Sequence, residues 1–377
     1  MTGLDGIRGL AALYVVLHHC WLLSFPGYPA NTGPWWVGGL VYGHLAVVVF
    51  ITLSGFSLAI SPARRGWRLG GLARFARRRA WRILPPYWAA LGLSMAVAAI
   101  VGPLPHLGSP NLRSTVVYGL LSQDFVRAPV PNGAFWSIAV EAGLYFVLPL
   151  LLLVRRLWGA VAVLALATVP VVALGLLRPG VSTVDKATGL TLQFAPMFAA
   201  GMVAAGVVAA VPRVRRLPWP WFACAATVPV VVLMAVNGPV WTERHYYWLD
   251  IAIGPGIALL LASVSVGRPS VLARFLGTRP VRALGSFSYS LYLIHVPVVV
   301  VVAFFVARPH FAAGLPRFWV TLGLAAPLAV VLAWGFGKVF EIPFQRYRSF
   351  AELRAAFART AFSKPPAAGA GRVSSRH

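Results

Sequence analysis

Residues 137–177 read SIAVEAGLYFVLPLLLLV-RR-LWGAVAVLALATVPVVALGLL, and this stretch decides the fold. Two apolar runs, Ser137–Val154 and Leu157–Leu177, are separated only by Arg155 and Arg156. Each run has about the 20 residues that a helix needs to cross a hydrocarbon core of about 30 Å. The runs are continuous and do not alternate between apolar and polar residues, which excludes a membrane β-barrel. The stretch therefore predicts a tight hairpin of two transmembrane helices.

Segments of this kind recur along all 377 residues, of which 59% are hydrophobic and only 11% are charged. A soluble domain has about 25% charged residues, so water is not the main solvent of this chain. We therefore expect an all-α integral membrane protein with about ten transmembrane helices. The predicted spans are Leu4–Leu23, Leu40–Ile60, Ile83–Val101, Ser137–Val154, Leu157–Leu177, Leu190–Val211, Trp219–Val236, Leu249–Val266, Gly285–Val306 and Phe318–Phe340.

The basic residues predict the orientation. With a cytoplasmic N-terminus, 25 of the 33 Lys and Arg residues fall in inner segments, 7 fall in outer loops, and Arg8 lies inside the first span. Such an excess is typical of the cytoplasmic side, so we expect both termini there, in the cytoplasmic membrane of a bacterium. The net charge of +25 sits in short clusters between apolar runs, which favours lipid headgroups over nucleic acid as the basic residues' partner.

The chain divides into two predicted parts. Residues 1–345 form one polytopic transmembrane domain, and residues 346–377 form a basic cytoplasmic tail that is partly disordered. The longest outer connection, 102–136, is rich in Pro, Gly and Asn, and we expect an ordered lid there. Cys20 and Cys224 fall inside predicted spans and indicate neither a disulfide framework nor a metal site.

Few ionisable residues lie inside the predicted spans, and such residues are costly and usually functional. Arg8 and His19 are 11 residues apart, which places them about 20° apart around a helix and about 16 Å apart along it. Asp5, three residues before Arg8, is placed to pair with it. Two interpretations stay open: a functional site along one helix face, or a buried salt bridge with a separate core histidine.

Two further spans carry polar residues at matching or mid-membrane depth. Glu141 enters the bilayer on the outer side at a depth similar to that of His19. We expect the carboxylate to hydrogen-bond the imidazole and fix its tautomer, the alternative being a bond to a neighbouring Ser, Tyr or backbone group. His295 is either a packing residue or part of the site. Asp250 lies at the outer mouth of its span, where we expect it to be solvated.

A basic cluster precedes the third span and consists of Arg74, Arg77, Arg78, Arg79 and Arg82. Contact with anionic headgroups is the commonest role of such clusters, and the spacing alone favours it. A cytoplasmic site for a phosphorylated cofactor is the functional alternative, because guanidinium groups bind phosphate well.

Several segments match one known family in order along the chain. They are Leu4-Asp-Gly-Ile-Arg8 with His18-His19, Phe50 to Phe56 around Ser54-Gly55, Arg79-Ala-Trp-Arg82-Ile-Leu-Pro85-Pro-Tyr87, Phe135-Trp136-Ser137 with Glu141 and Tyr145, Ser288 to Pro297 around His295, and Phe340-Glu341-Ile-Pro343. With these segments the chain resembles the acyltransferase 3 family of membrane O-acyltransferases. Two positions depart from the family pattern, since Val48 stands where an acidic residue is common and Ile51 where Phe is common.

The resemblance implies transfer of an acyl group, usually acetyl, from cytoplasmic acyl-CoA to a hydroxyl of a sugar or glycosylated acceptor. The catalytic residues implied are His19, Glu141 and Arg8, and the donor would be held by Arg8, Arg78, Arg79 and Arg82. Further candidate site residues are His18, Asp5, Ser54, Tyr87, Trp136, Tyr145 and His295. No metal is implied, and we expect no fused periplasmic hydrolase-like domain.

The resulting hypothesis makes His19 a general base, oriented by Glu141, that activates the acceptor hydroxyl. A covalent acyl-histidine intermediate stays open, as does the choice between a catalytic and a donor-binding role for Arg8. The rival function is a proton-coupled transporter or flippase of a glycan or small molecule, because Arg8, His19, Glu141 and His295 would also suit a proton path.

Overall fold

The computed structural model of the chain describes residues 2–109, 111–177 and 191–355, and the regular elements in these ranges are all helices. The long helices are α1 (Thr2–Leu22), α3 (His44–Ala63), α4 (Leu72–Val101), α6 (Trp136–Leu177), α8 (Phe194–Ala204), α10 (Trp219–Arg244), α11 (Tyr246–Ser265), α14 (Ser288–Val301) and α16 (Leu315–Phe336). The short ones are α2 (Trp35–Gly38), α5 (Leu112–Gly119), α9 (Pro212–Arg215), α12 (Ser270–Leu276), α13 (Arg279–Ser286), α15 (Arg308–His310) and α17 (Ile342–Arg346). Two π-helical turns, η4 (Val302–Ala307) and η5 (Gly337–Glu341), continue α14 and α16.

Seven of the described helices are long and apolar enough to cross a membrane, which is fewer than the ten predicted spans. One reason is α6, whose 42 residues would extend about 63 Å, twice the hydrocarbon thickness. Its helix is broken at Gly159, where φ is 91° and ψ is −174°, so α6 contains both spans of the predicted hairpin. The integral membrane fold is thus supported, while the total of ten and the orientation stay predictions.

The other two differences also have physical causes. The apolar helix over Phe194–Ala209 is shorter than a full span, and residue 190, where that span was expected to begin, lies outside the described residues. Helix α1 has the length of a span, but its two ionised residues and two histidines lower its mean hydropathy. These polar residues belong to the site described below.

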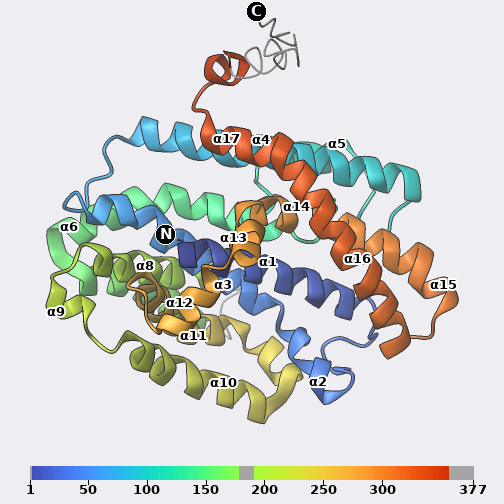
Figure 1. Ribbon diagram of the computed structural model, residues 1–377, viewed down its shortest axis with the longest axis horizontal. Helices are drawn as coiled ribbons and strands as arrows, with labels where there is room; N and C mark the ends of the chain where they lie inside the picture. The colour runs from blue at the N-terminus through green and yellow to red at the C-terminus, as the bar shows by residue number, and fades with distance from the viewer. Residues whose placement is uncertain (1, 110, 178–190, 356–377) are drawn as a thin grey trace, which may run out of the picture.

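The short connecting elements form two groups, one toward each end of the bundle. In Figure 1, α9, α12 and the N-terminus lie toward the left, whereas α2, α5 and α15 lie toward the right. The first group belongs to segments expected inside and the second to segments expected outside. The orientation of the helices in the membrane stays a prediction.

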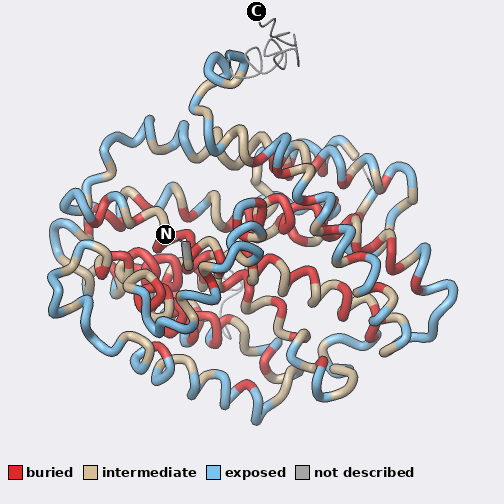
Figure 2. The backbone as a smooth tube through the Cα atoms, in the orientation of Figure 1, coloured by how far each residue is buried: buried red, intermediate tan, exposed pale blue. Residues whose placement is uncertain are grey.

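Helix α1 occupies the centre of the bundle, between α3, α13, α14 and α16. Buried residues gather along α1, α3 and α14, while much of α4 and α10 is exposed (Figure 2). Close contact with α13 depends on glycine: a Cβ at Gly9 would lie 2.6 Å from the backbone nitrogen of Gly285. This approach fixes the turn of α1 that carries Arg8.

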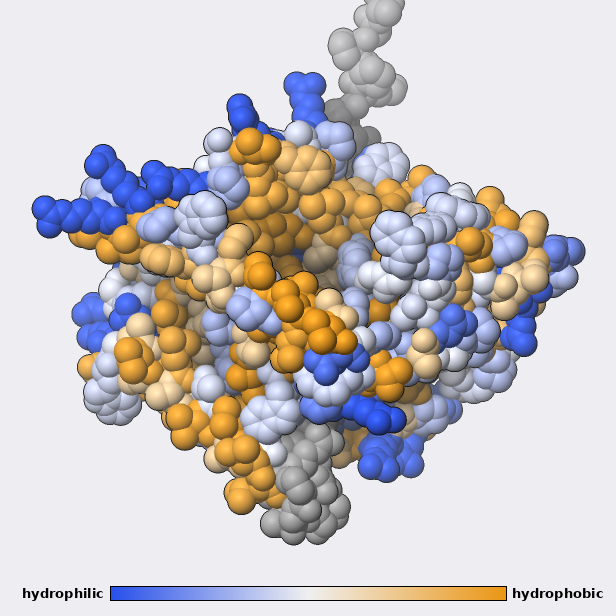
Figure 3. Space-filling model, turned by 90° about the horizontal axis from the view of Figure 1, so that it is seen from below, coloured by the Kyte–Doolittle hydropathy of each residue, from blue (hydrophilic) through white to orange (hydrophobic). Residues whose placement is uncertain are grey.

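Large apolar side chains cover the outside of the bundle, among them Phe146, Trp221 and Val331. Hydrophobic side chains spread over much of the face in Figure 3, and several hydrophilic side chains project at its edges. An exposed apolar surface of this extent is typical of contact with lipid.

Candidate functional site

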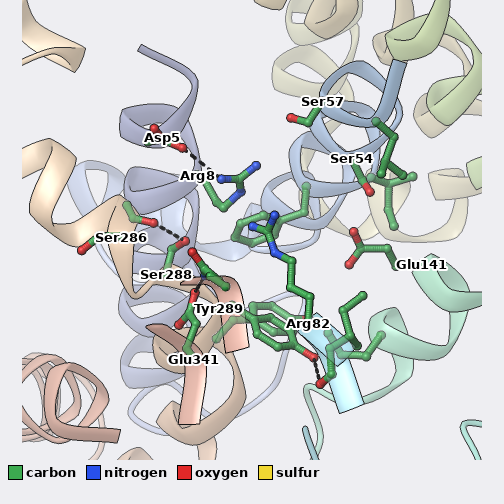
Figure 4. A pocket seen from close by; sticks show the side chains of 18 of the residues that line it. Asp5, Arg8, Ser54, Ser57, Arg82, Glu141, Ser286, Ser288, Tyr289 and Glu341 are labelled. Atoms are coloured by element: carbon green, nitrogen blue, oxygen red, sulfur yellow. Dashed lines mark hydrogen bonds and ion pairs between the residues drawn. The ribbon is translucent and has the colours of Figure 1, made fainter. Parts of the chain in front are cut away.

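A cavity of about 620 Å³ opens beside the first half of α1 (Figure 4). Its walls come from α1, α3, α4, α6, α13, α14 and the turn at η5. Segments that are far apart in the sequence therefore meet around one polar chamber inside an otherwise apolar bundle.

Arginines give the chamber its charge. Arg8 and Arg82 both direct their guanidinium groups into its centre (Figure 4). Nη1 of Arg8 lies 3.2 Å from Oδ1 of Asp5, so the predicted pair on the first turn of α1 is present. Three further arginines line the chamber: Arg79, Arg279 and Arg282. Five guanidinium groups around one cavity favour an anionic ligand.

Glu141 faces these arginines from the α6 side, next to Ser54 of α3 (Figure 4). Its Oε1 accepts a hydrogen bond from the hydroxyl of Tyr145 at 2.7 Å. The two residues are four positions apart on α6 and so lie on the same helix face. The expected hydrogen bond from Glu141 to His19 is not formed, and that prediction was wrong: Glu141 is part of the chamber wall, whereas His19 is not.

The opposite wall is ordered by a buried carboxylate. Oε2 of Glu341 accepts hydrogen bonds from the backbone N–H of Ser290 at 2.9 Å and from its hydroxyl at 2.6 Å. Its Oε1 accepts a hydrogen bond from Gln345 at 2.9 Å. Glu341 ends the π-helical turn η5, and such turns often occur at functional sites. The arrangement fixes α14 against the end of α16.

His19 contacts His295 of α14. Nδ1 of His19 lies 2.9 Å from the carbonyl oxygen of Val15, and Nδ1 of His295 lies 2.7 Å from that of Tyr292. A carbonyl oxygen only accepts, so Nδ1 carries the hydrogen on both neutral rings. Nε2 of His295 then accepts a second hydrogen bond from Nδ1–H of His19 at 3.3 Å. Nε2 of His19 keeps its lone pair and is available as a base.

A layer of three lining residues, Phe50, Ser137 and Tyr292, forms the part of the chamber wall that contacts His295. The hydroxyl groups of Tyr292 and Ser137, which both line the chamber, are 2.6 Å apart. The ring of Phe50 packs edge-on against Tyr292 at 5.4 Å between centroids, and the ring of His295 lies 5.8 Å away on another side. Tyr292 thus contacts both the chamber and the histidine pair.

Two more imidazoles lie close to His19. The ring of His18 lies 5.1 Å from that of His19, and its Nδ1 is 2.7 Å from the carbonyl oxygen of Leu40. The ring of His106, in the connection between α4 and α5, lies 6.1 Å from that of His19. Burial lowers the pKa of His106, which favours its neutral form. His106 has a positive φ of 65°, which is rare for a residue with a side chain.

Besides His18, His19 and His295, three more candidate residues do not line the chamber: Tyr87, Trp136 and Arg78. Tyr87 is fully buried and donates its hydroxyl to the carbonyl oxygen of Tyr118 at 2.9 Å. Trp136 stacks on the ring of His44 at the start of α6. Arg78 lines a second cavity, described below. The site role that the resemblance implied for Tyr87 and Trp136 stays a prediction.

The sequence did not predict a hydrogen-bonded contact between His44 and Asp250 near the start of α11. Asp250 is fully buried, and both its carboxylate oxygens lie 2.9 Å from Nε2 of His44. The expectation that Asp250 is solvated was wrong, because the first residue of α3 reaches it. Arg279 and Arg282 were also missed as site residues; their spacing of three on α13 was the signal that both share one face.

The metal-binding residue types form no cluster of three or more in the described parts of the chain. The polar groups that line the chamber include arginines, hydroxyl groups and the three carboxylates of Asp5, Glu141 and Glu341.

Several known proteins are similar to the chain in sequence. O-acetyltransferase OatA of Staphylococcus aureus is 23% identical over 342 residues, 80% of this chain and 51% of OatA. YrhL of Bacillus subtilis is 26% identical over 348 residues, 85% of this chain and 51% of YrhL. Nodulation protein 10 of Rhizobium leguminosarum bv. viciae is 27% identical over 179 residues, 43% of this chain and 47% of that protein. The chain spans about half the length of these relatives.

No solved structure matches the chain. The family profile described as an acyltransferase domain matches residues 1–337, and this range contains the arginine-lined chamber's helices α1, α3, α4, α6, α13 and α14 together with both histidines. The chain therefore belongs to the acyltransferase 3 family and carries its acyltransferase domain.

Proposed function

We propose that the protein is a membrane O-acyltransferase that moves an acyl group, usually acetyl, from cytoplasmic acyl-CoA to a hydroxyl of a sugar or glycosylated acceptor. The observation that carries this proposal is the position of the His19–His295 pair next to an arginine-lined chamber. Membership of the family supports the reaction class. The name of YrhL, which gives peptidoglycan as its acceptor, supports a carbohydrate acceptor.

The donor would enter the chamber from the side on which α4 begins. Arg79 and Arg82 would bind its phosphates, and Arg8 would lie beside the acyl-bearing arm. Bidentate hydrogen bonds from guanidinium groups suit phosphate oxygens and are stronger than bonds between neutral groups. The role of Glu141 in this arrangement is to balance the charge of these arginines and to hold Tyr145, in place of the bond to His19 that the sequence had suggested.

The chemical step would take place at Nε2 of His19. This nitrogen would remove the proton of the acceptor hydroxyl while the hydroxyl oxygen attacks the thioester carbonyl. The new C–O bond forms, the C–S bond breaks, and the departing CoA thiolate takes up the proton from the imidazolium. His295 would stabilise the imidazolium through its Nε2 lone pair, and the acyl group would have to pass the layer formed by Phe50, Ser137 and Tyr292.

Purified protein in detergent or nanodiscs, supplied with acetyl-CoA and an acceptor glycan, tests this function. We expect release of CoA thiol together with an acetylated glycan, detected by mass spectrometry. Both His19→Ala and Glu141→Ala should insert and fold but lose transfer. Wild-type transfer by either variant would refute the role assigned to that residue.

A transporter or flippase is the second candidate, because ionisable residues line a chamber inside the membrane. The same assay separates the two functions. A transporter would move its substrate across a sealed vesicle without consuming acetyl-CoA, whereas an acyltransferase releases one thiol for each acetyl group transferred.

A further inference from the structure

A second cavity, of about 390 Å³, adjoins the chamber at the start of α4. The two cavities share Arg79, Arg82 and Gln345 in their linings. The arginines of the second cavity are Arg74, Arg77, Arg78, Arg79, Arg82 and Arg348. Among the described residues that line this cavity, Glu352 is the one carboxylate, and its Oε2 accepts the backbone N–H of Arg348 at 2.7 Å. The described lining thus has six guanidinium groups and one carboxylate, so its positive charge suits the binding of an anion.

The wall opposite α4 comes from the segment that follows the last span. Trp81 of α4 fixes this segment, because its indole N–H donates to the carbonyl oxygen of Tyr347 at 2.8 Å. The indole ring also packs edge-on against Phe350, with 4.6 Å between centroids, and lies 5.2 Å from the ring of Phe344. These contacts hold Arg348 facing the arginines of α4.

A short helix begins within the same segment. The hydroxyl oxygen of Ser349 accepts the backbone N–H of Glu352 at 3.2 Å, and the Ser349 carbonyl accepts that of Leu353 at 3.1 Å. A serine with a glutamate three residues later is a common pattern at the start of a helix. The segment is therefore ordered around Arg348.

One arginine on the border between the two cavities has a free donor. Nε of Arg79 is buried and lacks a hydrogen-bond partner among the residues that the structure describes. Leaving a buried charged donor unpaired is costly, so a ligand that supplies an acceptor here would gain affinity.

We propose that the second cavity binds the phosphorylated nucleotide end of the acyl-CoA donor, and that Arg348 recognises the phosphate on its ribose. This inference rests on the proposed function. The order of groups in the donor matches the order of the cavities: the acyl-bearing arm lies in the chamber, the diphosphate lies at the shared Arg79 and Arg82, and the ribose phosphate lies beyond them. A phosphomonoester carries a charge of about −1.5 to −2 at neutral pH, which suits the remaining arginines.

The comparison of acetyl-CoA with 3′-dephospho-acetyl-CoA tests the proposal, because the two donors differ only in that phosphate. We expect Arg348→Ala to raise the KM for acetyl-CoA at least about tenfold, as expected for the loss of one hydrogen bond between charged groups. The KM for the dephosphorylated donor should change less than about twofold. Arg354→Ala is the matched control, since Arg354 is exposed on the same segment and does not line the cavity.

Binding measurements keep the test independent of turnover. CoA should bind the wild-type protein more tightly than dephospho-CoA, and Arg348→Glu should remove that difference. Equal changes in KM for both donors, or no change, would overturn the proposal. An effect of Arg348→Ala that is seen only in nanodiscs containing phosphatidylglycerol, and equally for both donors, would make the cavity a lipid-headgroup site. Efficient acetyl transfer without discrimination between the donors would refute this proposal alone and leave the proposed function standing.

Discussion

Nε2 of His295 lies 3.3 Å from Nδ1 of His19, on a ring whose own Nδ1 is held by the carbonyl oxygen of Tyr292. The bond requires an acceptor at position 295, and an amide oxygen would supply one. We expect His295→Gln to keep kcat within about threefold of wild type and His295→Leu to lower it about 10- to 100-fold, the usual effect of losing a hydrogen bond to a charged group. Steady-state acetyl transfer measures both values. Equal losses in the two variants would show that His295 only fills space.

Removal of the base itself should have a larger effect. His19→Ala should lower kcat about 10²- to 10⁴-fold, the range typical of a general base. His310→Ala is the control, because His310 is exposed and is not part of the described chamber lining. The pH profile of kcat in the wild type should show one ionisation that is absent from the pH profile of the residual activity of His19→Ala.

The hydrogen bond between Glu141 and Tyr145 leads to a prediction about energetic coupling between residues. Residues that share a hydrogen bond give non-additive effects when both are changed. We expect Glu141→Ala and Tyr145→Phe to be non-additive in kcat/KM, and Glu141→Ala and His295→Leu to be additive within experimental error. Strong coupling of Glu141 to His295 or His19 would restore the arrangement first suggested by the sequence.

Arginines inside the chamber should act on the donor. Arg82→Ala should raise the KM for acetyl-CoA about 10- to 100-fold, because it removes a guanidinium group that faces the chamber. Arg64→Ala, on the exposed connection after α3, is the control and should leave this KM unchanged. Isothermal titration with CoA gives the same comparison without the chemical step.

The close packing of α3 on α8 leads to a prediction about the stability of the fold. A Cβ at Gly55 would collide with the carbonyl oxygen of Phe198, so Gly55→Ala has to push the two helices apart. Overpacking of this kind costs about 1–3 kcal/mol. We expect a lower melting temperature in detergent for Gly55→Ala and an unchanged one for Gly92→Ala, whose Cβ would meet open space. Equal melting temperatures would mean that the helices adapt without strain.

The contact of Asp5 with Arg8 could be predicted because both residues lie on one turn of the same helix. The orientation inferred from the basic residues stays a prediction. Contacts between helices were harder to predict, since depth in the membrane does not fix rotation about a helix axis. Glu141 and His19 have similar predicted depths, yet Glu141 turns toward Tyr145 on its own helix. The contact between His44 and Asp250 was not predicted, because the two residues are 206 positions apart in the sequence.

The layer of Phe50, Ser137 and Tyr292 also has a consequence for the membrane as a whole. A continuous aqueous route from the arginine chamber past the four imidazoles would conduct protons and dissipate a proton gradient across the membrane. The packed rings of Phe50 and Tyr292 and the hydroxyl pair of Tyr292 and Ser137, in the chamber wall that contacts His295, would interrupt such a route. Variants with a small residue in place of Tyr292 should therefore make the cell membrane leaky, a cost quite separate from any loss of catalysis.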